Sequence, residues 1–134
     1  MCGITGAIWT DPRLAIDQAT LRRMTDALRH RGPDAEGFWS DDIVHLGHRR
    51  LSIIDLSTSA NQPLHSSNQN LVMVYNGELY NFKELKEQLI TRNKIVFKTE
   101  SDSEVILEGI QAYGENFLQQ MKGMFAVEIG RAHV

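Results

Sequence analysis

Short apolar runs rich in β-branched and aromatic residues recur along the chain, and such runs are typical of buried strands. Residues 38–39 and 43–46 flank the polar stretch 40–42, and together they predict a hairpin. The polar stretch 57–70 predicts an ordered surface loop. The other runs that predict strands are residues 4–9, 51–54, 71–75, 95–98 and 124–127.

Other segments carry apolar residues at helical spacing. Residues 17–29 have one apolar face, formed by Leu21, Met24 and Leu28. A second helix is predicted between Asn81, which can cap its start, and Asn93, which suits a left-handed C-cap. A third is predicted to begin at Ser101-Asp102-Ser103-Glu104, which has capping-box spacing, and to end at Gly114.

The order of these elements favours a layered α+β fold over a doubly wound parallel sheet, because strands come in runs and hairpins and do not alternate strictly with helices. A chain of 134 residues fits one domain or part of one. Its 42% hydrophobic and 23% charged residues are the proportions of an ordinary soluble globular protein.

Charge and targeting patterns exclude several classes of function. The net charge of −3 gives no electrostatic case for a nucleic-acid or anionic-membrane partner. No apolar run approaches the roughly 18 residues that span a bilayer, and we expect no secretory signal. One cysteine cannot form an internal disulfide, which fits a reducing compartment. We therefore expect a cytoplasmic protein.

The only cysteine, Cys2, directly follows Met1. Removal of Met1 would place a thiol and a free α-amine on one residue. In peptides an α-amine has a pKa of about 8 and a thiol of about 8.5, so such an amine can accept the thiol proton near neutral pH. This is the arrangement of N-terminal nucleophiles, in which the amine replaces the histidine of a triad. Taken alone, a cysteine near a terminus is more often a small apolar residue without chemistry.

Further polar residues at predicted element ends have both a structural and a functional interpretation. The Arg50 guanidinium could hold a carboxylate with two parallel hydrogen bonds, whereas Arg49 is expected to be a solvated surface arginine. Asn76-Gly77 predicts a tight turn, yet the Asn76 amide and the Gly77 N–H could also form an oxyanion hole. Asp102 complements the dipole at a helix start.

Short segments in a fixed order carry a more specific signal. They are Met1-Cys2-Gly3-Ile4-Thr5-Gly6, Arg29-His30-Arg31-Gly32-Pro33-Asp34, Arg50-Leu51-Ser52-Ile53-Ile54-Asp55, Tyr75-Asn76-Gly77-Glu78, Ser101-Asp102-Ser103-Glu104-Val105-Ile106 and Gly123-Met124-Phe125-Ala126. Together they resemble the class II glutamine amidotransferase domain of the asparagine synthetase family. The resemblance covers essentially all of residues 2–127, and the His30 to Asp34 segment is expected to place a loop over the pocket.

The resemblance implies an N-terminal-nucleophile hydrolase fold, an αββα sandwich with two antiparallel sheets between helical layers. It implies Cys2 as the nucleophile, with its own α-amine as the base after Met1 removal. Asn76 and Gly77 would then form the oxyanion hole.

The same resemblance implies L-glutamine as the substrate. Arg50 would bind its α-carboxylate and Asp102 its α-ammonium. The backbone of Ile53 and Ile54 would lie beside the substrate, and Glu78 would line the pocket. Neither a cofactor nor a metal is expected for this domain.

In the family, ammonia passes to a C-terminal synthetase domain that uses ATP and Mg to amidate aspartate. We expect this domain to be absent here, the amidotransferase domain to cover residues 1–127 incompletely, and the full-length protein to be a homodimer. Residues 128–134 are expected to be a non-native tail, because they resemble an in-frame translation of a sequencing adapter. The alternatives are an amidotransferase that serves another acceptor, or an inactive or merely glutamine-binding fragment.

Overall fold

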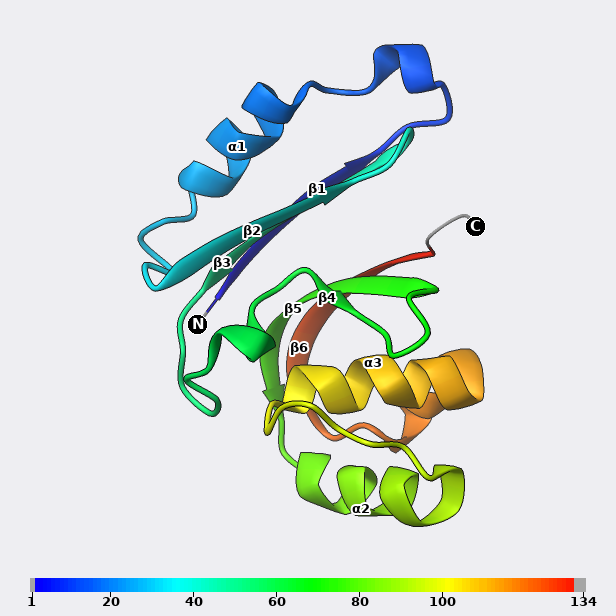
Figure 1. The fold of residues 1–134 in the computed structure, drawn as a ribbon. Helices are drawn as coiled ribbons and strands as arrows, with labels where there is room; N and C mark the ends of the chain where they lie inside the picture. The colour runs from blue at the N-terminus through cyan, green and yellow to red at the C-terminus, as the bar shows by residue number, and fades with distance from the viewer. Residues whose placement is uncertain (1, 132–134) are drawn as a thin grey trace.

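The protein is described by a computed structural model over residues 2–131, and its elements form four layers (Figure 1). One antiparallel sheet, sheet A, has the strand order β1-β3-β2, and helix α1 covers its outer face. Its strands are β1 (Gly3–Ile8), β2 (Ala35–Ser40) and β3 (Val44–Arg50), and α1 comprises Gln18–Asp26. A short 3-10 turn, η1 (Pro12–Leu14), joins β1 to α1.

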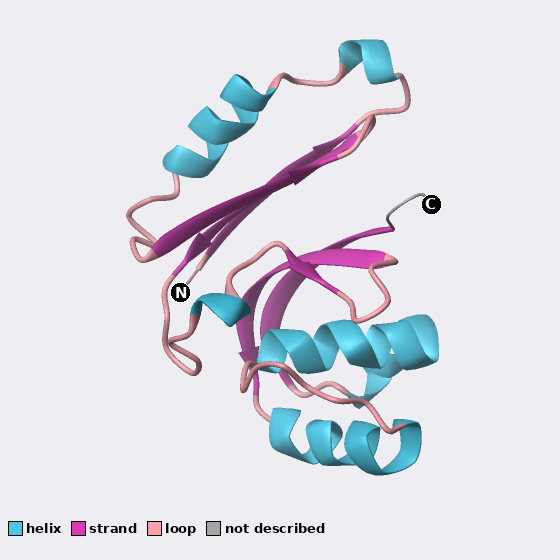
Figure 2. Cartoon of the chain, in the orientation of Figure 1, coloured by secondary structure: helices cyan, strands magenta, loops and turns pink. Residues whose placement is uncertain are grey.

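The second antiparallel sheet, sheet B, has the order β4-β5-β6 and carries α3 and α2 on the face away from sheet A (Figure 2). Its strands are β4 (Leu64–His65), β5 (Leu71–Leu79) and β6 (Gly123–Arg131). The helical elements of this half are η2 (Thr58–Ala60), α2 (Phe82–Asn93), α3 (Asp102–Tyr113) and η3 (Gly114–Gln120). Two antiparallel sheets between helical layers confirm the predicted α+β sandwich. Among residues 2–131, no helix combines the length and the apolar character needed to cross a membrane.

Helix α1 shows how local sequence signals and close packing act together. The Asp17 side chain caps it by accepting a hydrogen bond from the Thr20 N–H at 2.7 Å, and Leu21 is fully buried against sheet A. Thr25 is also fully buried, and a Cβ added at Gly47 of β3 would lie 2.1 Å from its Oγ1. Glycine at position 47 therefore lets α1 approach the sheet.

The core is divided unequally between the layers. The larger cluster lies between sheet B and its helices and includes Leu71, Met73, Tyr75, Leu79, Leu85, Leu89, Val105, Ile106, Leu107 and Phe117. The smaller cluster lies between the sheets and contains Leu46, Val72 and Val74, with Ile4, Trp39 and Val44 packed against it. Alternate residues of β5 thus point to opposite clusters, as a strand buried on both faces requires.

Two predicted strands are wrong. Residues 51–54 form a loop after β3, in which Ile53 and Ile54 are exposed. Both partners of β3 end at this point, since β1 begins opposite Arg49 and β2 begins opposite Arg50, so residues 51–54 have no strand to pair with. Residues 95–98 are also a loop. There the Lys98 and Thr99 N–H groups donate to the Glu104 carboxylate, so a side chain replaces the strand partner.

Two predicted helix ends also need correction, and part of the proposed tail is structured. Asn81 precedes α2, but its side chain bonds the Gln120 carbonyl and the Lys122 N–H and makes no capping hydrogen bond. The left-handed residue after α2 is Lys94, with φ of 58°, one position beyond Asn93. Residues 128–131 belong to β6, which pairs with β5. The remainder of the proposed tail lies outside the described residues, and its non-native origin stays a prediction.

Candidate active site

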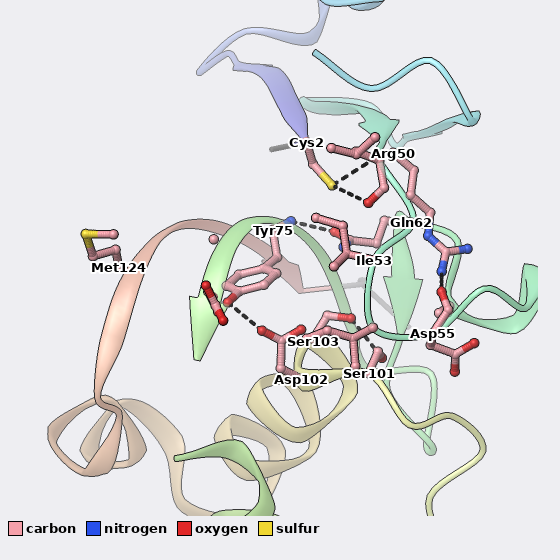
Figure 3. A pocket seen from close by; sticks show the side chains of 15 residues that line it. Cys2, Arg50, Ile53, Asp55, Gln62, Tyr75, Ser101, Asp102, Ser103 and Met124 are labelled. Atoms are coloured by element: carbon pink, nitrogen blue, oxygen red, sulfur yellow. Dashed lines mark hydrogen bonds between the residues drawn. The ribbon is translucent and has the colours of Figure 1, made fainter. Parts of the chain in front are cut away.

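A cavity of about 210 Å³ opens where the start of β1 meets β5 and the start of α3 (Figure 3). We call it the Cys2 cavity. The predicted site residues that line it are Cys2, Arg50, Ile53, Ile54, Gly77, Glu78 and Asp102. These residues come from segments far apart in the chain, and the fold brings them around one space.

The Cys2 thiol is held against the loop that follows β3. The Leu51 N–H donates to its Sγ at 3.3 Å, and the Leu51 carbonyl oxygen lies 3.7 Å from the same sulfur. The Arg31 Nε donates to the Cys2 carbonyl at 3.1 Å. The thiol and the backbone carbonyl of Cys2 are therefore both held in place, which suits a residue that must present a reactive atom to a bound substrate.

The segment from His30 to Asp34 positions both Cys2 and the loop beside it. Besides the Arg31 contact, the Asp34 carboxylate accepts a hydrogen bond from the Ser52 N–H at 2.8 Å. A Cβ added at Gly32 would lie 2.4 Å from the Arg49 carbonyl carbon, so glycine is needed where this segment crosses β3. The expectation that the segment places a loop at the pocket is consistent with these contacts.

Arg50 is buried, and its guanidinium organises the same loop. Its N–H groups donate to the Ser57 carbonyl and the Asn61 Oδ1, each at 2.6 Å, and to the Asp55 carbonyl. A guanidinium has five N–H donors, so these contacts leave capacity for a carboxylate. Arg50 therefore shapes the cavity wall as well as lining it.

Arg49 differs from the solvated side chain that we expected. It is buried on the opposite face of β3, where its guanidinium forms ion pairs with Asp26 at 3.1 Å and Glu36 at 3.0 Å. Adjacent strand residues point to opposite faces, so Arg50 turns toward the cavity while Arg49 ties β3 to α1 and β2.

Asp102 lies at the first turn of α3 and is almost fully buried. Its Oδ2 accepts hydrogen bonds from the Tyr75 hydroxyl at 2.9 Å and from the Leu79 N–H at 3.0 Å. Ser101 caps the helix by accepting from the Glu104 N–H. The predicted capping box is only half present, because the Glu104 carboxylate binds Lys98 and Thr99.

The backbone of β5 directs the Gly77 N–H toward the cavity. The Tyr80 N–H donates to the Lys122 carbonyl, so even-numbered residues of β5 bond toward β6 and odd-numbered residues point the other way. The Tyr75 and Leu79 N–H groups indeed bond Gln62 Oε1 and Asp102 Oδ2 on that side. The Gly77 N–H lies between these two.

Glycine at position 77 is required by the neighbouring strand. An added Cβ would lie 2.4 Å from the Met124 carbonyl oxygen of β6. Asn76 is not among the residues that line the Cys2 cavity. Its side chain is on the face of β5 toward sheet A, the sheet of Cys2, and its buried Oδ1 has no hydrogen-bond partner within residues 2–131.

Burial controls the ionisation of two side chains behind the cavity. Burial raises the pKa of the Tyr75 phenol far above its usual value, and the negative charges of Asp102 and Glu78 add to the effect, so Tyr75 remains a hydrogen-bond donor. Burial also lowers the pKa of His48 to about 4, although the His48 contact with the Tyr75 carbonyl opposes this, and Arg50 lowers it further.

The sequence analysis did not identify several residues of the cavity wall. These are Leu51, Asp55, Ala60, Gln62, Tyr75, Ser101, Ser103 and Met124. Most of them lie in the same short sequence segments as the predicted site residues, and this nearness in sequence could have identified them. Gln62 had no such signal, since only folding brings the loop before β4 against β5.

No group of three or more His, Cys, Asp or Glu side chains that could hold a metal ion occurs within residues 2–131. The chemistry of the cavity is instead that of one thiol, one guanidinium and several carboxylates. Such a set can bind a zwitterion at both ends and present a nucleophile to a third group of the same molecule.

Comparison with known proteins decides the family. The family described as "Glutamine amidotransferase domain" matches residues 1–133. The chain belongs to this family. It is 38% identical to asparagine synthetase [glutamine-hydrolyzing] 1 of Bacillus subtilis and 39% identical to the asparagine synthetase of Zea mays, in each case over 94% of the chain.

Proteins with other names are also similar to the chain. The protein named amidase chry2 from Gibberella zeae is 44% identical over 79% of the chain. The glutamine phosphoribosylpyrophosphate amidotransferase of B. subtilis has a similar structure, with a TM-score of 0.69 and 26% identity over 97% of the chain and 34% of that protein. The chain spans about a fifth of the length of its asparagine synthetase relatives.

Proposed function

We propose that this amidotransferase domain hydrolyses L-glutamine through a covalent thioester on Cys2. The observation that carries the proposal is that the chain's single cysteine lines a cavity together with Gly77 and Asp102, which come from other elements. The family match and the relatives named as glutamine-hydrolysing support glutamine as the substrate.

In the first half of the reaction, removal of Met1 frees the α-amine of Cys2. This amine takes the thiol proton, and the thiolate attacks the glutamine carboxamide carbon. The negative charge that develops on the carboxamide oxygen is stabilised by the Gly77 N–H, whereas the Asn76 amide, which is not among the cavity-lining residues, stays a predicted second donor. The protonated amine returns its proton to the leaving nitrogen, so ammonia departs and a γ-glutamyl thioester remains.

In the second half, water attacks the thioester carbon and gives up one proton to the α-amine. The carbon–sulfur bond breaks, the thiolate regains a proton, and glutamate leaves. Each group thus returns to its starting state, and the net reaction is glutamine plus water giving glutamate plus ammonia.

Recognition of glutamine follows from the charges around the cavity. Arg50 and Asp102 both line the cavity, and in this proposal the Arg50 guanidinium binds the α-carboxylate and Asp102 the α-ammonium. Ile53, Ile54 and Glu78 also line the cavity, and we propose that the backbone of Ile53 and Ile54 lies beside the substrate. A molecule that lacks either charged group should bind more weakly, because one buried charge would then lose its partner.

For the whole protein, we propose that ammonia passes to a synthetase domain that uses ATP and Mg to amidate aspartate. The asparagine synthetase relatives, which are about five times longer than this chain, support this assignment. A homodimeric assembly and a cytoplasmic location belong to the same proposal.

A second candidate is an amidotransferase that serves another ammonia acceptor. The 44% identity to amidase chry2 exceeds the identity to the asparagine synthetases named above, although it covers less of the chain. The glutaminase half is common to both candidates, so the acceptor distinguishes them.

The glutaminase proposal is tested by the release of glutamate from L-glutamine by the parent chain and by Cys2→Ala. We expect release by the parent alone, and we expect intact mass to show that Met1 is absent. The Cys2→Ser variant is a matched control, because it keeps the α-amine and a weaker nucleophile. Equal glutamate release by the parent and Cys2→Ala would exclude the covalent mechanism.

A further inference from the structure

We infer that Tyr75 is a positioning residue for the amino end of glutamine, acting through Asp102. This inference rests on the proposed function, in which Asp102 binds the α-ammonium. Tyr75 itself needs no contact with the substrate. Its hydroxyl donates a hydrogen bond to Asp102 Oδ2 at 2.9 Å, inside the Cys2 cavity (Figure 3).

The two oxygens of Asp102 have different surroundings. Oδ2 accepts from both the Tyr75 hydroxyl and the Leu79 N–H, and within residues 2–131 the hydrogen bonds of this carboxylate are confined to Oδ2. A carboxylate held at one oxygen by two donors has a fixed orientation, so its second oxygen is kept available for a cation. The ammonium group of glutamine fits that second oxygen.

Tyr75 is itself held rigidly, which makes it an effective support. Its N–H donates to the Gln62 Oε1 at 2.6 Å, and its carbonyl lies 3.1 Å from the His48 Nε2 on sheet A. Its ring is almost fully buried in the cluster between sheet B and the helices. The hydroxyl therefore has one position, fixed by both sheets of the sandwich.

The ionisation of Tyr75 is consistent with this role. Burial and the neighbouring carboxylates of Asp102 and Glu78 raise the pKa of the phenol, so it keeps its proton at any pH at which the protein works. A protonated phenol can only donate to an ionised carboxylate. The Tyr75 hydroxyl thus stays the donor in its contact with Asp102 Oδ2.

The test measures ligand binding by calorimetry in chains that also carry Cys2→Ala, so that glutamine is bound without turnover. The ligands are L-glutamine and 4-carbamoylbutanoate, which is glutamine without the α-amino group. We expect Tyr75→Phe to weaken glutamine binding roughly tenfold, as expected for loss of a hydrogen bond to a charged group, and to change binding of the analogue less than twofold.

The chain offers a matched control in Tyr113, whose hydroxyl bonds Asn93 on the exposed side of the helical layer. Tyr113→Phe removes the same atom and should leave both affinities unchanged. Asp102→Asn should reproduce the selective loss of glutamine binding. Retained binding of the analogue by Tyr75→Phe also shows that this variant is folded.

The outcomes separate the inference from the function on which it rests. If glutamine binds and Asp102→Asn weakens it, but Tyr75→Phe does not, the positioning role is refuted while the proposed function stands. Equal weakening of both ligands by Tyr75→Phe would also refute it, because that pattern indicates a general structural role. If the Cys2→Ala chain does not bind glutamine, the proposed function fails and the inference fails with it.

Discussion

Acidification should destabilise the fold through His48, the buried histidine between the two sheets. Its ring is 1% exposed, its Nε2 lies 3.1 Å from the Tyr75 carbonyl, and burial lowers its pKa from 6.5 to about 4. The folded protein thus holds this ring neutral where the unfolded chain would protonate it. Between pH 6.5 and pH 4 the unfolded chain binds more protons, so stability falls as the pH falls.

The size of the effect follows from the two pKa values. A fall from 6.5 to about 4 corresponds to about 3 kcal/mol at a pH below both values, and to about 2 kcal/mol at pH 5. Domains of this size are stable by roughly 5–15 kcal/mol in total. One histidine therefore accounts for a substantial part of the acid sensitivity that we expect.

The assay is urea unfolding at several pH values between 4.5 and 7.5, in the parent and in His48→Gln. Glutamine at this position cannot titrate, and its amide can still donate to the Tyr75 carbonyl. We expect the difference in unfolding free energy to move by about 2 kcal/mol in favour of the variant between pH 7.5 and pH 5. The exposed His65→Gln variant should follow the parent. If the unfolding free energies of the parent and His48→Gln changed with pH in parallel, the proposed effect of His48 on acid stability would be refuted.

Two further substitutions test the loop before α3 and the cavity wall. Glu104→Ala removes a buried carboxylate that accepts hydrogen bonds from Lys98 and Thr99, so the free energy of unfolding in urea should fall by about 3 kcal/mol. The surface variant Glu87→Ala should stay within about 0.5 kcal/mol of the parent. Similar values for the two variants would contradict the view that Glu104 anchors the loop before α3. Lysine in Arg50→Lys cannot reproduce the guanidinium contacts, so the KM for glutamine should rise roughly tenfold at a nearly unchanged kcat. An unaltered KM in the glutaminase assay would show that Arg50 does not bind the carboxylate.

The sequence was most informative where a local pattern and its partner lie close together in the chain. The stripe around Leu21 and the capping serine Ser101 are examples, because each depends on neighbours within one or two helical turns. The run 51–54 was mispredicted as a strand for the opposite reason. Its β-branched residues favour a strand locally, but the ladders of β3 with β1 and β2 end at Arg49 and Arg50, so the residues that follow have no strand to pair with.

The residues of the candidate site likewise fall into those that a short motif predicts and those that only the fold brings together. Cys2 and Asp102 were identified because short motifs contain them, and the fold does place both at one cavity. Gln62 and the supporting role of Tyr75 were not foreseen. Their contacts depend on which direction the N–H groups of β5 point, and that direction is fixed by the pairing with β6, some fifty residues further along the chain.

The shortness of β4 explains why a cavity exists at this edge of sheet B at all. β4 has two residues and pairs only with Met73 and Val72, so the odd-numbered N–H groups of β5 beyond them have no strand to bond. Two of these groups hold side chains of the site, since Tyr75 bonds Gln62 and Leu79 bonds Asp102. The Gly77 N–H between them donates to no side chain or loop carbonyl within residues 2–131. An unpaired backbone donor is costly unless something occupies it, and the oxyanion of a substrate adduct on Cys2 would be a partner of the right charge.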